Sequence, residues 1–109
     1  MANKFGIRRS TNNQFYWNLN AANGEPIAHS ETYVSKQGAI NGIDSVKRNA
    51  VLGQYTLFIG GDSKYYWNLK APNNEIIARS EGYTTKQGAE NGIASTKRNA
   101  PTAPVVDES

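Results

Sequence analysis

The chain lacks several features that would narrow its function. Its 109 residues contain no cysteine, which excludes disulfides, thiolate catalysis and any cysteine-ligated zinc or iron–sulfur centre. No apolar run approaches the roughly 20 residues that a membrane-spanning helix needs. The first residues, MANKFG, also lack the apolar core of a secretory signal. These absences lead us to expect a cytoplasmic protein.

The motifs that carry enzyme chemistry are missing as well. The sequence has no dinucleotide-binding glycine motif, no Walker loop, no nucleophile elbow and no histidine-rich zinc motif. We therefore predict no catalytic, cofactor-binding or metal-binding residues, and we expect a protein that is not an enzyme. The alternative of a small-molecule enzyme has no motif to support it.

The composition is that of a folded domain with a weakly basic surface. Apolar residues make up 38% of the chain and charged residues 19%, with two Trp, six Tyr and three Phe. The net charge is +3, the sum of +3 over residues 1–50, +2 over 51–100 and −2 over the last nine. A nucleic-acid binder more often has a dense basic stripe, so this spread of charge favours an ordinary solvated surface.

The chain contains one sequence unit twice. Residues 16–50 align with residues 66–100 at a shift of 50 without a gap, and 24 of these 35 positions are identical. Two copies are too few for a solenoid, and one copy is too short to bury a comfortable core. We expect one domain over residues 1–100 whose repeats, 1–50 and 51–100, pack about a pseudo-two-fold axis as a monomer with an internal pseudo-dimer. Such pairing would still leave sheet edges free.

Each repeat begins with a strand-like pattern. Apolar and polar residues alternate over residues 4–9 and 15–21, and the segment 10–13 between them is rich in turn formers. Asn23 and Gly24 favour a second tight turn, which is followed by a short third strand over residues 25–30 and, in the second repeat, over 75–80. The two repeats therefore predict six strands.

The second part of each repeat has a helical period. Ala39, Ile43 and Val46 share one helical face, after a plausible N-cap at Ser35 that is matched by Thr85. Glycines at 38 and 42, repeated at 88 and 92, weaken a helix by about 1 kcal/mol each. The expected compensation is a close approach of helix to sheet.

These patterns predict an α+β fold made by tandem duplication of a βββα unit. Its antiparallel sheet would carry two helices packed on one face. Residues 101–109 are expected to form a mostly disordered acidic tail. Val105 and Val106 are the exception, because either this pair or Val51 and Leu52 after the first helix could add a short strand.

The repeated motif resembles that of a known family. Residues Phe15 to Glu25 and Tyr65 to Glu75 read F/Y-Y-W-N-L-x-A-x-N-x-E, and both are followed by S-E-x-Y-x-x-K-Q-G-A-x-N-G-I-x-S-x-K-R-N-A. This is similar to the YegP-like family of small uncharacterised proteins with one or two βββα repeats. The resemblance implies two strand-rich, helix-bearing motifs around a shared sheet, with possible exchange of strands after the helix. It implies no catalytic or binding residues.

Titratable residues in the repeat offer few candidates for chemistry. His29 aligns with Arg79, and a permanent cation cannot replace a general base or metal ligand, so His29 is interpreted as an incidental surface residue. Glu25 and Glu75 are interpreted as solvated turn residues. Glu31, which has its equivalent in Glu81, is expected to make a salt bridge or a backbone contact near Lys36.

The exposed face of the sheet offers the best candidate for binding. If Trp17 and Leu19 point inward, strand alternation places four residues on the face opposite the helices: Tyr16, Asn18, Tyr66 and Asn68. The main hypothesis is a structural or protein-interaction module with an unknown protein partner. The alternative is weak binding of single-stranded RNA by stacking on the tyrosines, although tyrosine is also simply a favoured strand residue.

Overall fold

The computed structural model describes residues 3–109 and contains the predicted duplicated βββα unit. The elements of the first repeat are β1 (Lys4–Arg9), β2 (Phe15–Asn20), β3 (Pro26–His29) and α1 (Lys36–Asn49). Those of the second are β4 (Gln54–Ile59), β5 (Tyr65–Lys70), β6 (Ile76–Ser80) and α2 (Lys86–Asn99). None of the helices in this part of the chain is long and apolar enough to cross a membrane.

Local sequence accounts for the turns and the helix starts. Gly24 and its equivalent Asn74 have φ of 88° and 72°, a backbone conformation that Gly and Asn tolerate better than other residues. The hydroxyl of Ser35 accepts a hydrogen bond from the backbone N–H of Gly38 at 3.0 Å, and Thr85 does the same for Gly88. Both predicted N-caps are confirmed.

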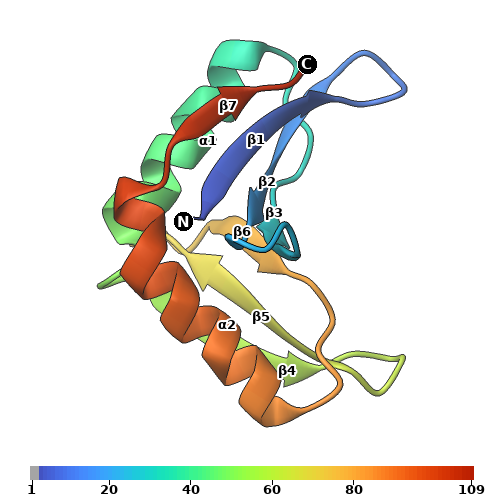
Figure 1. The fold of residues 1–109 in the computed structure, drawn as a ribbon, viewed down its shortest axis with the longest axis vertical. Coiled ribbons are helices and arrows are strands. Elements are labelled where there is room, and N and C mark those ends of the chain that lie inside the picture. The colour runs from blue at the N-terminus through green and yellow to red at the C-terminus, as the bar shows by residue number, and fades with distance from the viewer. Residues whose placement is uncertain (1–2) are drawn as a thin grey trace.

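The two repeats meet at the centre of one seven-stranded sheet. Its strand order is β4-β5-β6-β3-β2-β1-β7, and β3 pairs with β6 in the antiparallel sense. His29 lies opposite Arg79, its own equivalent at the shift of 50, so the approximate two-fold axis passes between these residues. In Figure 1 the first repeat occupies the upper half of the molecule and the second the lower half, with both helices to the left.

The segment after α2 breaks this symmetry. It forms a short 3-10 helix, η1 (Ala100–Thr102), and then β7 (Val105–Asp107), which pairs with β1 in the parallel sense. The sheet is therefore mixed, where the sequence predicts an antiparallel one, and the tail is ordered, where a mostly disordered one was expected. Backbone pairing with β1 holds it, as in the hydrogen bond of 2.9 Å from the Phe5 N–H to the Pro104 carbonyl. Val51 and Leu52 form a turn instead of a strand.

A single core lies between the sheet and the two helices. Its largest fully buried side chains come from both repeats: Trp17, Trp67, Phe5, Ile7, Leu19, Ile43, Leu69 and Val46. The rings of Phe5 and Trp17 meet edge to face with centroids 5.3 Å apart, and Tyr55 and Trp67 repeat this contact at 5.4 Å. Both helices therefore cover one face of the sheet, and the other face is left uncovered.

Candidate functional site

The helix-free face is formed by strand residues that alternate with the core. Trp17 and Leu19 are buried, so strand alternation places Tyr16 and Asn18 on the opposite side of β2. Tyr66 and Asn68 occupy the same positions on β5. All four are half-buried. We call the surface around Tyr16, Asn18, Tyr66 and Asn68, together with the residues between them on β3 and β6, the helix-free face.

The strand register places the two asparagines in one row across the sheet. Asn18 lies opposite His29, His29 opposite Arg79, and Arg79 opposite Asn68. The row thus runs through the approximate two-fold axis, with one amide on each side of the central His and Arg. The four predicted residues belong to one continuous surface, and whether they bind a partner stays a prediction.

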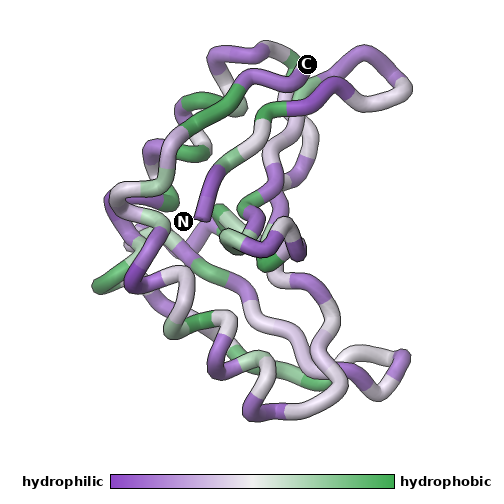
Figure 2. The backbone as a smooth tube through the Cα atoms, in the orientation of Figure 1, coloured by the Kyte–Doolittle hydropathy of each residue, from purple (hydrophilic) through white to green (hydrophobic). Residues whose placement is uncertain are grey.

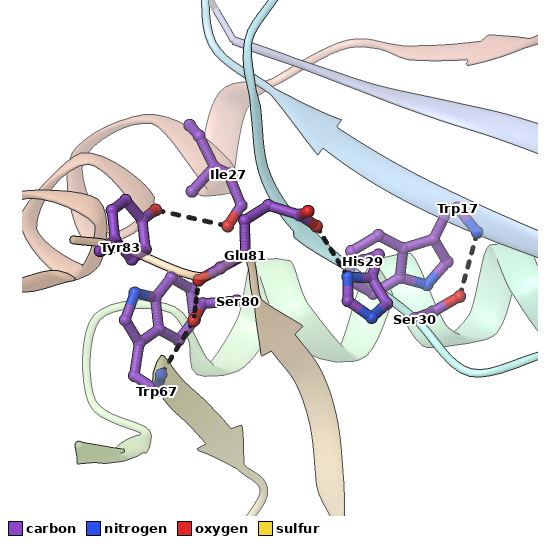
Figure 3. Close-up of polar contacts among 8 residues, drawn as sticks. All are labelled: Trp17, Ile27, His29, Ser30, Trp67, Ser80, Glu81 and Tyr83. Carbon is purple, nitrogen blue, oxygen red and sulfur yellow. Dashed lines mark hydrogen bonds and ion pairs between the residues drawn. The ribbon is translucent and has the colours of Figure 1, made fainter. Parts of the chain in front are cut away.

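Two ion pairs between the repeats occupy the centre of this face. The Nδ1 atom of His29 lies 2.8 Å from the Oε2 atom of Glu81, as Figure 3 shows. The symmetric pair joins Arg79 and Glu31, with 3.9 Å between Nη1 and Oε2. His29 is therefore part of a contact between the repeats, and whether it has any chemical role stays a prediction. Glu31 makes its salt bridge with Arg79 and not with Lys36, because antiparallel pairing of β3 with β6 brings Arg79 to Glu31 from the other repeat.

A buried serine in each repeat holds the adjoining glutamate in place. The hydroxyl of Ser30 accepts a hydrogen bond of 3.0 Å from the Trp17 N–H and donates one of 2.7 Å to the Glu31 carbonyl. Ser80 does the same between Trp67 and the carbonyl of Glu81 (Figure 3). Sequence reasoning did not single out these serines. The sequence feature that could have identified them is the Ser-Glu pair, which recurs at the same place in both repeats.

The two tyrosines have different surroundings. The Tyr66 ring stacks on Phe58 with centroids 5.7 Å apart, and its hydroxyl donates to the Asp62 carboxylate at 2.5 Å. This hydrogen bond raises the pKa of the Tyr66 hydroxyl and lowers the pKa of Asp62. In the first repeat Arg8 lies opposite Tyr16, where the second repeat has Phe58. One end of the face is therefore aromatic and the other carries a cation.

Most charges on and beside this face have a partner within the chain. Lys4 and Arg8 each lie 3.5 Å from the carboxylate of Glu108. Glu25 and Glu75 are exposed in turns, where their backbone N–H groups donate to Asn23 and Asn73. These two acids lie apart from the central ion pairs, so the duplicated carboxylates do not assemble into one site.

The surface has no enclosed site in the part of the chain that the structure describes. No pocket is found over residues 3–109, and no three His, Asp or Glu side chains in this range lie close enough together to hold a metal ion. A small ligand is normally enclosed by a concave pocket.

Comparison with known proteins gives a consistent family and no assigned activity. The family model described as "Domain of unknown function (DUF1508)" matches residues 10–54 and 62–107. A UPF0339 protein of Pseudomonas aeruginosa is 48% identical over 50 residues, which are 46% of this chain and 46% of that protein, so the match spans about half of its length. A UPF0339 protein of Treponema denticola is 50% identical over 50 residues, which are 46% of this chain and 86% of that protein.

Two solved structures share the whole fold. The solution structure of YegP of E. coli, a protein of unknown function, has a TM-score of 0.89 and 42% identity, and the match covers 99% of this chain and 94% of that one. The solution structure of a UPF0339 protein of Shewanella oneidensis has a TM-score of 0.90 and 39% identity, with 98% and 92% of the two chains covered. The likeness therefore includes both repeats.

Proposed function

The chain belongs to the family described as domain of unknown function DUF1508, and from that premise we propose that it is a cytoplasmic, non-enzymatic module that binds a protein partner. The proposed binding surface is the helix-free face. The observation that carries this proposal is the pair of half-buried tyrosines, Tyr16 and Tyr66, held on rigid strands at either side of a charge-balanced centre. Tyrosine and arginine are enriched in protein interfaces.

Charge and shape support a protein partner over other ligands. The central basic side chains, His29 and Arg79, already contact Glu81 and Glu31. Nucleic-acid binding draws on cations that are free to neutralise phosphates, and these two would first have to leave their carboxylates. An enzyme would need convergent groups in a pocket, and none is found over residues 3–109.

The direct test is co-purification with the chain immobilised as bait. We expect a protein that is retained by the wild type and lost from the double variant Tyr16→Ala/Tyr66→Ala, because the variant removes both aromatic contacts. Leu52→Ala is the matched control, since Leu52 is 91% exposed and lies in the turn between α1 and β4, off this face. Recovery of no partner, or equal recovery by the wild type and the double variant, contradicts the proposal.

Single-stranded RNA is the second candidate. It draws on Arg8, which lies opposite Tyr16 and would have to leave Glu108 to contact the phosphate of a base stacked on that ring. Titration of labelled single-stranded RNA at low and raised salt separates the two candidates. Binding that weakens with salt and is lost in Tyr16→Ala supports RNA, and no binding at low salt removes this candidate.

A further inference from the structure

The two outer edges of the sheet are not equivalent. β7 covers the edge of β1, with hydrogen bonds of 2.9 Å from the Phe5 N–H to the Pro104 carbonyl and 2.8 Å from the Glu108 N–H to the Ile7 carbonyl. At the other end of the sheet, β4 pairs with β5 alone among the strands of residues 3–109. The second repeat thus has an open edge where the first has a covered one.

The open edge presents backbone groups that are ready to pair. β4 pairs with β5 in the same register as β1 with β2, displaced by 50 residues. Phe5 and Ile7 direct their backbone groups toward β7, so their equivalents Tyr55 and Leu57 direct their N–H and carbonyl groups outward. An uncovered row of such groups is a template for another strand.

The side chains of β4 do not protect this edge. Lys4, Arg8 and Arg9 of β1 correspond to Gln54, Phe58 and Ile59 of β4, so the second edge strand carries no charge. Figure 2 shows the difference, with the hairpin end of β1 hydrophilic and that of β4 hydrophobic. Phe58 is 41% exposed and Ile59 64%. Natural edge strands usually carry charges, proline or bulges that prevent such exposure.

An acidic strand like β7 does not fit this second edge. On the covered edge the Glu108 carboxylate lies directly over Gly6, where even a Cβ atom would overlap it, and it pairs with Lys4 and Arg8. On β4 the residue equivalent to Gly6 is Thr56, and neither cation is present. An uncharged, apolar strand therefore suits this edge better than an acidic one.

We propose that the occupant is β4 of a second copy of this chain, paired in the antiparallel sense about a two-fold axis at Leu57. In that register Tyr55 lies opposite Ile59 of the partner and Thr56 opposite its Phe58. Aromatic residues then face β-branched ones and no like charges meet, which is the favourable case for cross-strand pairs. The sheet continues from one copy into the next.

The other end of the sheet explains why such an assembly stops at two copies. After β4 pairs with β4, the remaining outer edge of each copy is that of β7, which is only three residues long and ends in Asp107, and a short, charged edge strand is a poor template for further pairing. The association is isologous and closed, and it does not propagate into a filament. One strand pair is a small interface, so we expect dissociation in the micromolar to millimolar range. This dimer replaces the monomer that the sequence predicts.

The first experiment measures mass in solution by sedimentation velocity from about 1 μM to about 1 mM. We expect the wild type to pass from monomer to dimer and the double variant Phe58→Arg/Ile59→Arg, which gives β4 the arginines of β1, to stay monomeric with an unchanged circular dichroism spectrum. Leu52→Arg and Val34→Arg are controls, because these apolar residues are 91% and 85% exposed and lie outside β4. They should dimerise like the wild type. A monomeric wild type at every concentration, or loss of the dimer in either control, overturns the proposal.

The second experiment places the contact without any substitution. Amide hydrogen exchange of the wild type should slow with rising concentration at Tyr55 and Leu57, whose N–H groups face the open edge. Exchange at Thr56 and Phe58 should stay constant, because their N–H groups face β5 in the inferred alternation. Slowing that occurs elsewhere in the chain, and not at Tyr55 and Leu57, contradicts pairing through β4.

Discussion

At the scale of single residues, the duplicated glycines are explained by one aromatic cluster in each repeat. A Cβ atom on Gly42 would overlap the Tyr33 hydroxyl and lie 3.2 Å from the Trp17 Nε1 atom. Gly92 has the same relation to Tyr83 and Trp67. Burial in this cluster raises the pKa of the Tyr33 hydroxyl. The absent side chain therefore lets each helix lie directly against the cluster, as the sequence predicts from the cost in helix propensity.

Replacing this glycine should destabilise the fold even though alanine favours helices. We expect Gly42→Ala to lower the free energy of unfolding by about 1–3 kcal/mol, because the added methyl group pushes the partly buried Tyr33 ring away from its packing against the core. The measurement is urea denaturation followed by circular dichroism.

The control for this prediction is Gly61→Ala, since a Cβ atom on Gly61 would meet no other atom within 4 Å. We expect it to change stability by less than about 0.5 kcal/mol. A neutral or stabilising Gly42→Ala would mean that the tyrosine moves aside freely, and the steric explanation would then be wrong.

Other single residues show where prediction from sequence stops. The alignment pairs His29 with Arg79, but a repeat alone does not say that these residues lie opposite each other. Nor does it say that Glu81, 52 positions from His29, lies within 2.8 Å of its ring. Both facts depend on the pairing of β3 with β6, which is a long-range contact. The face of Tyr16 and Tyr66, by contrast, follows from local alternation.

At the scale of elements, β7 is three residues long and carries an ion pair at its end. The Lys36 ammonium group lies 2.8 Å from the Asp107 carboxylate and holds the pKa of that carboxyl below its usual value, with help from Ser109. The sequence offered Val105 and Val106 as a possible short strand, but it could not give the pairing, because two apolar residues show no period and the partner strand is about 100 positions away. The longer strands and both helices were predictable from their periodicity.

The ion pair predicts how β7 responds to acid. The folded pKa of Asp107 is lowered, so its contribution is fully present above the ordinary carboxyl pKa of about 4 and is lost as the pH falls through the lowered value. In Lys36→Met the pKa should return toward its usual range, and β7 should leave β1 at a higher pH than in the wild type. Amide chemical shifts of Val105 and Val106, followed by NMR from neutral pH downward, measure this release.

The second repeat offers a matched control for this titration. Lys86 is the equivalent of Lys36 but belongs to the second repeat, whose outer strand β4 has no strand like β7 beside it among residues 3–109. Lys86→Met should leave the pH of release unchanged. If Lys36→Met and Lys86→Met behave alike, the ion pair does not hold β7, and backbone pairing alone must account for its order.

At the scale of the whole molecule, the repeats are joined at the centre and share one core. β3 and β6 pair through two residue pairs, Ala28 with Ser80 and His29 with Arg79. Both helices contact η1, whose Ala100 is fully buried, so the chain end also links the halves. The duplication predicted the approximate two-fold axis. It did not predict that β7 breaks the symmetry, because the chain continues differently after each helix. After α1 it enters β4, whereas after α2 it forms η1 and β7.

We expect the two repeats to unfold together as one cooperative body. Each repeat carries its own fluorescent probe of this behaviour. Trp17 and Trp67 are both fully buried, one in each repeat. In Trp17→Phe the remaining fluorescence reports the second repeat, and in Trp67→Phe it reports the first, while circular dichroism reports both. The most direct measurement is urea unfolding of each variant by the two methods. We predict the same midpoint from fluorescence and circular dichroism within each variant. A repeat that loses its tryptophan signal while the other half keeps its structure would show two independent bodies and contradict the claim.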